Sequence, residues 1–187
     1  MGASPIVRHV YQEHIERYGE PDRSIVYEDY AAPPERPSRI DIFVWPASAQ
    51  DGITLFSTMG MAAAPMSGAP HRAELHFAIR RHLDDATVGS ISKFLANLAI
   101  HPFLQATFFD WWHKVRDPGP LPLFTSATSV LFHPRFIETG WDTITFDGLM
   151  TKILNVVPIT PEEYDMHPLG PLGKHWETAG IDLFEPR

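Results

Sequence analysis

Ten histidines make metal binding and acid–base catalysis the first chemistry to consider in this sequence. In the run RAELHFAIR, Glu74 and His76 would share one face of a strand, and His71 lies just before it. A carboxylate and two imidazoles could hold a zinc ion. However, the flanking Arg72 and Arg80 favour an exposed polar face, and no His-Glu-x-x-His motif occurs. We therefore expect no metal site and no cofactor.

Asp110, His113 and a serine could form a hydrolytic triad, which is the second chemistry that the residue types allow. The sequence contains no Gly-x-Ser-x-Gly motif to support it, and no glycine-rich phosphate-binding motif. We therefore expect no catalytic residues. A metal-dependent or serine-type hydrolase is the alternative function.

An aromatic cluster is the third candidate site. Five of the ten residues from Phe103 to Trp112 are phenylalanine or tryptophan. In an extended segment the adjacent Trp111 and Trp112 would point to opposite sides, so one of them would face solvent or a partner. Aromatic side chains are frequent anchors in protein interfaces. Burial in the core is the competing interpretation for each residue of this cluster.

Strands must position most of these side chains, and the apolar pattern predicts where they lie. Period-2 alternation or continuous apolar runs predict strands at residues 40–46, 53–58, 72–80 and 151–158. Weaker patterns predict strands in SIVYEDY, LFTSATSVLF and TITF. In the 72–80 strand, the apolar residues would face a core, and the polar residues would face water or a partner.

Helices are predicted in three places. Local signals predict one at residues 5–18, with His14 packed at the edge of the core. A second should span about residues 88–100, where Pro102 prevents continuation. A capping box, TPEE at residues 160–163, should begin a C-terminal helix.

The order of these elements predicts the fold class. Strands occur in consecutive runs rather than alternating with helices, which favours an α+β fold with a mixed, mostly antiparallel sheet and packed helices. We expect one domain over residues 1–187, with a Pro-rich connector at residues 31–38 after the N-terminal helix.

Composition excludes several classes of partner. The chain has 15 basic and 23 acidic residues and a net charge of −8, so it would repel nucleic acid and could attract a basic protein. It has no cysteine, so disulfide and thiol chemistry are absent. We find no membrane-spanning segment and no signal peptide, and we expect a cytoplasmic protein.

Five motifs carry a family resemblance over roughly Ile40 to Trp176. They are IFVWP, ITLFSTMGM, RAELHFAIRR, FLANLA and ILNVVPITPEEY, in this order and at these spacings. Together they resemble the suppressor of fused (SUFU) family, particularly its bacterial single-domain members. The matching part is the N-terminal lobe of the animal protein, and this chain is too short to hold the second lobe.

The resemblance implies a SUFU-like α/β sandwich and a non-enzymatic protein-binding function. The animal member holds a short peptide of a transcription factor as an added strand between its lobes. For bacterial members the resemblance implies immunity proteins that neutralise toxins, so the partner would be a basic toxin domain or an extended peptide. The animal peptide contacts map near His101, Phe109, Trp112 and His113, which are our predicted partner-binding residues. In the family, the segment STMGM ends a strand, so residues 60–66 should form a connection between strands rather than a catalytic loop.

Overall fold

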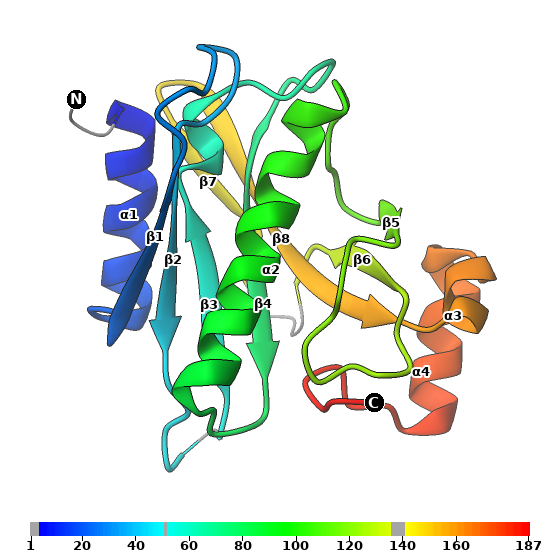
Figure 1. Ribbon diagram of the computed structural model, residues 1–187. Coiled ribbons are helices and arrows are strands. Elements are labelled where there is room, and N and C mark those ends of the chain that lie inside the picture. Colours follow the sequence, from blue (N-terminus) through cyan, green and yellow to red (C-terminus); the bar gives the residue numbers. More distant parts are fainter. Residues whose placement is uncertain (1–3, 51, 136–140) are drawn as a thin grey trace.

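The structure is a computed structural model that describes residues 4–50, 52–135 and 141–187. In these residues, eight strands form one sheet in the order β1-β2-β3-β4-β8-β6-β5, and β7 pairs with β8 off this path. The β4–β8 pair is parallel and the other described pairs are antiparallel. The predicted α+β class with a mixed, mostly antiparallel sheet is therefore confirmed (Figure 1).

The strands follow the apolar pattern of the sequence closely. Their bounds are β1 (Arg23–Glu28), β2 (Arg39–Trp45), β3 (Thr54–Met59), β4 (Arg72–Ile79), β5 (Lys114–Arg116), β6 (Ser129–His133), β7 (Thr143–Phe146) and β8 (Leu149–Ile159). The predicted strands at residues 40–46, 53–58, 72–80 and 151–158 correspond to β2, β3, β4 and β8. The Pro-rich connector at residues 31–38 joins β1 to β2. The sequence analysis did not predict the short strand β5.

The helices are α1 (Pro5–Tyr18), α2 (Asp85–Leu104), α3 (Pro161–Asp165) and α4 (Gly173–Ala179), with short helical turns η1 (Met61–Ala63) and η2 (Pro168–Leu172). The prediction that α2 stops before Pro102 was wrong. Pro102 lies inside the last turns of α2, where its burial against the core offsets the one hydrogen bond it removes.

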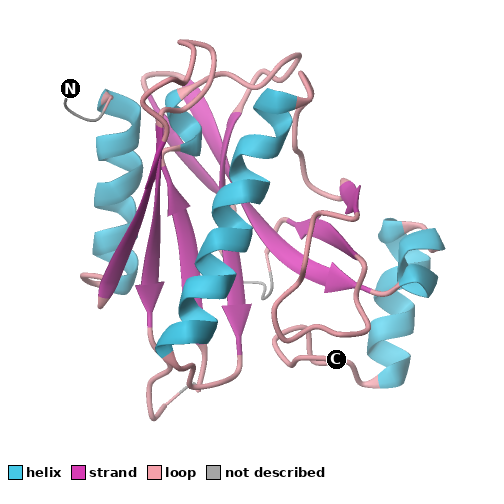
Figure 2. Ribbon diagram, viewed as in Figure 1, coloured by secondary structure: helices cyan, strands magenta, loops and turns pink. Residues whose placement is uncertain are grey.

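Helices cover both faces of the sheet (Figure 2). The side chains of Ile40, Ile42 and Val44 in β2 pack into a core with α2, whereas the neighbouring Phe43 packs with α1 on the opposite face. A third cluster packs Trp176 of α4 against Val157 and Ile159 in the C-terminal part of β8. Because successive β2 side chains pack into cores on opposite faces of the sheet, β2 is apolar on both faces.

The prediction that the polar face of β4 meets water or a partner was wrong for Glu74 and His76. Both side chains are buried, because α1 and the segment after β3 cover that face. The Glu74 carboxylate accepts hydrogen bonds from the Thr58 hydroxyl at 2.6 Å and from the backbone N–H groups of residues 60, 61 and 62 at 2.9–3.3 Å. Burial raises the pKa of Glu74 to about 7, although these hydrogen bonds oppose the increase.

Those three amides belong to the small-residue segment between β3 and β4. The segment connects two neighbouring strands, as predicted, and it also surrounds the buried Glu74 carboxylate. Gly60 makes this possible because its φ is +122° and a Cβ there would lie 2.5 Å from the Arg39 carbonyl oxygen. The methionines 59, 61 and 66 are buried.

His14 is fully buried rather than at the edge of the core. Its Nδ1–H donates to the Val10 carbonyl at 2.7 Å, so Nε2 must act as an acceptor when the ring is neutral. His76 Nε2–H donates to this atom at 2.9 Å, and the Ser57 hydroxyl lies at the same distance. This buried polar group joins α1 to β3 and β4.

The predicted capping box at the start of α3 is confirmed. The Thr160 hydroxyl accepts from the Glu163 N–H at 3.2 Å, and the Glu163 carboxylate accepts from the Thr160 N–H at 2.8 Å. The same carboxylate accepts from the Trp176 indole at 2.7 Å and from Arg187. The Glu163 carboxylate therefore connects α3 to α4 and to the C-terminal Arg187, whereas bonds from Lys114 connect α3 to β5.

Candidate functional site

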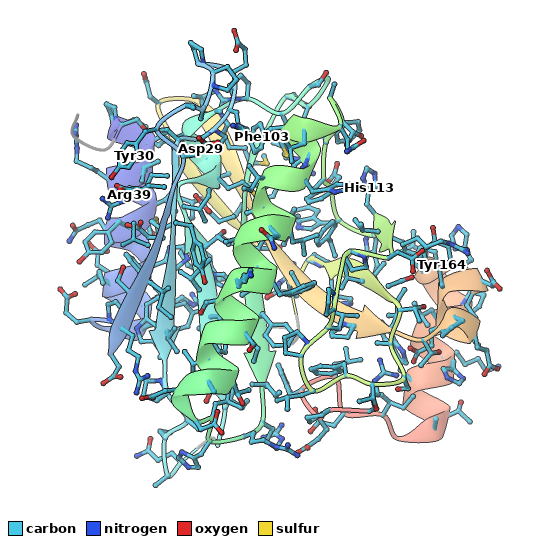
Figure 3. The ribbon with its side chains drawn as sticks, in the orientation of Figure 1. Asp29, Tyr30, Arg39, Phe103, His113 and Tyr164 are labelled. Atoms are coloured by element: carbon cyan, nitrogen blue, oxygen red, sulfur yellow. The ribbon has the colours of Figure 1, made fainter. Side chains whose placement is uncertain are left out.

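A pocket of about 780 Å³ lies between the C-terminal end of α2, strand β5 and the α3–η2 segment. All four predicted partner-binding residues, His101, Phe109, Trp112 and His113, line this pocket. In Figure 3, His113 lies between α2 and β5, and Tyr164 lies on α3. The four residues fall within positions 101–113, and the structure places them around one pocket.

Phe109 forms a buried wall of the pocket. Its side chain is only 3% exposed, and its ring lies 4.5 Å from that of Phe132 in the main core. The half-buried His101 ring stacks on Phe109, with ring centres 5.9 Å apart. Phe109 therefore contributes to the shape of the pocket as a core residue, whereas the more exposed His101 ring could contact a bound partner directly.

Trp112 and His113 lie in a turn, so the premise that this segment is extended was wrong. The His113 N–H donates to the Asp110 carbonyl at 3.2 Å, and Trp112 adopts a left-handed φ of +70°. In this turn Trp111 and Trp112 are both half-buried. The Trp111 indole donates to the Ile153 carbonyl at 3.2 Å, and the Trp112 ring meets the His133 ring edge-on at 4.6 Å.

Asp110 and His113 do not pair as members of a hydrolytic triad would. The Asp110 carboxylate accepts from the Lys152 ammonium at 2.5 Å and from the Trp111 N–H at 2.7 Å. Burial raises the pKa of Asp110, but these hydrogen bonds and the Lys152 charge outweigh it and hold the pKa below its usual value. The His113 ring instead lies 5.2 Å from the Phe108 ring.

Metal binding finds no geometric support in the part of the chain that the structure describes. No group of three or more histidine, aspartate or glutamate side chains there could hold a metal ion. Glu74 and His76, which the sequence offered as possible ligands, are engaged in separate buried hydrogen-bond networks.

No described helix has both the length and the apolar character that a membrane span requires.

Two cationic side chains on β5 form the α3 side of the pocket. The Lys114 ammonium donates to the carbonyl oxygens of Tyr164 at 2.6 Å and Met166 at 2.5 Å, at the C-terminal end of α3. The Arg116 guanidinium lies 4.3 Å from the centre of the Tyr164 ring. Sequence reasoning missed these residues, because a three-residue strand carries almost no periodic signal.

Among the strands that the structure describes, β5 is also an edge of the sheet. It pairs with β6 on one side and ends the strand order on the other. The His113 carbonyl accepts from the Phe132 N–H, and the Asp117 N–H donates to the Thr128 carbonyl. Because backbone groups alternate in an antiparallel pair, those of Lys114 and Arg116 point away from β6.

The pocket therefore borders the strand at the edge of the sheet. Its lining comes from both faces of the sheet: Phe108 and Val115 on the α2 side, Tyr164 and His167 on the α3 side. A site of this kind can bind an extended peptide through backbone hydrogen bonds and adjacent side-chain pockets.

The sequence model described as suppressor of fused protein (SUFU) matches residues 36–170, more than half of the 187-residue chain. The chain belongs to the suppressor of fused family. A search of curated proteins gave no match. The family membership confirms the resemblance carried by the five sequence motifs.

Solved structures with the same fold include other SUFU proteins. A SUFU homologue from Neisseria gonorrhoeae FA 1090 aligns with a TM-score of 0.62 and 15% identity, over 95% of this chain and 90% of that one. A chain of a Sufu–Fu complex aligns with a TM-score of 0.60 and 9% identity, over 95% of this chain and 83% of that one. Drosophila Suppressor of Fused aligns with a TM-score of 0.52 and 10% identity, over 84% of this chain but 42% of that one.

Proposed function

We propose that this chain is a non-enzymatic protein-binding protein that holds an extended segment of a partner along the free edge of β5. The observation that carries the proposal is that the pocket and the open strand edge coincide. A strand added there would hydrogen-bond to the outward N–H and C=O groups of Lys114 and Arg116. Its alternate side chains would enter the pocket on the α2 side and the α3 side.

The residues around β5 suit this role because they are held in place before binding. The Trp112 N–H donates to the Phe132 carbonyl at 2.6 Å, and the Lys114 ammonium is anchored on α3. A preorganised site loses less conformational entropy when it binds an extended segment. The Sufu–Fu complex, one chain of which has the same fold as this chain, also supports a protein-binding function.

The biological role that we propose for this binding is neutralisation of a toxin, as an immunity-type protein acting in the cytoplasm. Its support is the net charge of −8, which would speed association with a basic toxin domain. Co-expression with a basic toxin domain that binds the chain tests this role: the chain should restore growth of cells that the toxin alone kills. Growth that stays arrested despite comparable expression would contradict it.

The binding site is tested by changing His113 to alanine. His113 is half-buried beside the pocket, so its truncation should leave folding nearly intact. We expect the affinity for the protein that copurifies from native cells to fall by roughly 30-fold or more, the usual effect of losing an interface anchor. Isothermal titration calorimetry measures this.

His82→Ala is the matched control, because His82 is exposed and lies outside the β5 pocket. It should bind as the parent protein does. If His113→Ala retains full affinity, or if His82→Ala loses as much, the site does not lie at β5.

A further inference from the structure

The charge around the β5 pocket differs in sign from the charge of the whole chain. The chain carries a net charge of −8. The charged residues that line the pocket are Lys114, Arg116 and Asp165, and three histidines, at positions 101, 113 and 167, line it as well. With neutral histidines, the two cationic residues and one acidic residue give the lining a formal charge of +1. A local charge of this sign favours an anionic group in the pocket.

Arg116 is the group best placed to bind an anion. Its guanidinium stacks on the Tyr164 ring at 4.3 Å, and it makes no ion pair with a residue that the structure describes. Ion pairs engage other described arginines, at positions 23, 36, 39, 80, 135 and 187. Stacking on an aromatic ring orients the planar guanidinium and leaves its N–H groups free for a carboxylate.

Lys114 cannot play the same role, although it lies on the same face of β5. Its ammonium donates to three backbone carbonyl oxygens, at distances of 2.5–3.4 Å. These bonds use its donors, so Lys114 supplies positive charge without an open donor. Specific recognition on this side therefore falls to Arg116.

We propose that the partner segment on β5 carries an acidic side chain that binds Arg116, with apolar side chains at the neighbouring positions. This inference rests on the proposed function, because it assumes that a strand is added at β5. Arg116 and Tyr164 lie on the α3 side, whereas Val115 and Phe108 lie on the α2 side with the main core. Side chains of an added strand alternate in the same way, so the recognised segment has its acidic residue on the α3 side, at Arg116, and apolar residues immediately before and after it.

This preference is compatible with a basic partner. The net charge of the whole chain acts over long distances and governs the rate of encounter, whereas the contact at Arg116 acts within the complex and governs its lifetime. A partner domain that is basic overall could therefore dock through a short acidic and apolar segment.

The experiment is an NMR titration of the ¹⁵N-labelled chain with three synthetic peptides. The first is acetyl-Gly-Val-Glu-Val-Glu-Val-Gly-amide, and the other two replace both glutamates with glutamine or with lysine. We expect the Glu peptide to shift the amide signals of residues 114 and 116 and to bind roughly tenfold more tightly than the Gln peptide. The Lys peptide should bind most weakly.

Arg116→Gln should abolish the preference for the Glu peptide, whereas Arg81→Gln, which changes an exposed arginine outside the pocket, should preserve it. Equal binding of all three peptides at β5 would overturn the acidic preference and leave strand addition intact. A preference that survives in Arg116→Gln would also overturn the inference. If no peptide shifts the β5 amides, strand addition itself is contradicted.

Discussion

Protonation of the buried histidine pair should make stability depend on pH in a way that can be traced to one residue. Burial lowers the pKa of His14 from 6.5 to about 4, although its bond to the Val10 carbonyl opposes this. The groups that face it are His76 and Ser57 from the sheet and the rings of Tyr18, Trp45 and Trp141. Burial also lowers the pKa of His76, and the neighbouring charges of His14 and Arg17 add to this.

The size and sign of the effect follow from this pKa difference. His14 becomes protonated at about pH 6.5 in the unfolded chain but only at about pH 4 in the folded chain. The free energy of unfolding therefore falls as the pH drops from 6.5 to about 4. Each pH unit below 6.5 costs about 1.4 kcal/mol. At pH 5 the contribution of His14 is a loss of about 2 kcal/mol relative to pH 8.

Glu74 must be separated from this effect, because it acts in the opposite direction. Burial raises its folded pKa to about 7, so its contribution to stability falls as the pH rises from about 4.5 to 7. The parent protein alone would therefore show partial cancellation. Comparison with His14→Gln removes the Glu74 contribution, since Glu74 and its hydrogen-bond partners are present in both proteins, and leaves the effect of His14 together with its influence on His76.

Urea denaturation of both proteins at pH 8 and pH 5 is the assay. The stability advantage of the parent over His14→Gln should shrink by about 2 kcal/mol between pH 8 and pH 5. An advantage that is the same at both pH values would mean that the fold does not keep His14 neutral, and the burial argument would be refuted.

Three stability predictions can be checked by the same denaturation method. Thr160→Ala removes the side-chain acceptor of the capping box and should cost about 1 kcal/mol; an unchanged midpoint would contradict this. Gly60→Ala places a Cβ 2.5 Å from the Arg39 carbonyl oxygen at a positive φ and should cost more than about 2 kcal/mol, whereas Gly89→Ala in α2 has open space and should be neutral or stabilising. Equal effects of the two glycine changes would refute the close-approach argument. Phe109→Ala opens the main core and should cost about 3–5 kcal/mol; a loss below about 1 kcal/mol would show that Phe109 is not a core residue.

Much of the fold was predictable because its signals are local. The capping box at residues 160–163 needs only four residues to specify a helix start, and the apolar run in β8 indicates an interior strand by itself. The bounds of α1 follow from Pro5 and Gly19 in the same way. These features depend little on which part of the chain packs against them.

The burial of β4 was not predictable from its alternation. Alternation distinguishes two faces of a strand, but it does not reveal that α1 and the Gly60 segment cover the polar one. Glu74 and His76 resemble exposed residues because their hydrogen-bond partners come from other elements. Only tertiary structure brings the Thr58 hydroxyl and the His14 ring to them.

The candidate site was predictable in part. The resemblance to the SUFU family pointed to His101, Phe109, Trp112 and His113, which the structure places around one pocket. It did not identify Arg116 or the free edge of β5. Tyr164 reaches Arg116 only because β8 carries α3 back to the start of β6, which pairs with the last residue of β5, and no local pattern encodes that path.

Hydrogen–deuterium exchange measured on the chain alone and in complex with its copurifying protein partner tests the central claim most directly. An added strand must hydrogen-bond to the outward amides of β5, so the exchange of Lys114 and Arg116 should slow markedly in the complex. Protection should extend to the neighbouring segments that line the pocket, at residues 107–113 and 164–168. A complex in which protection appears elsewhere while the β5 amides exchange as in the free chain would contradict partner binding at β5.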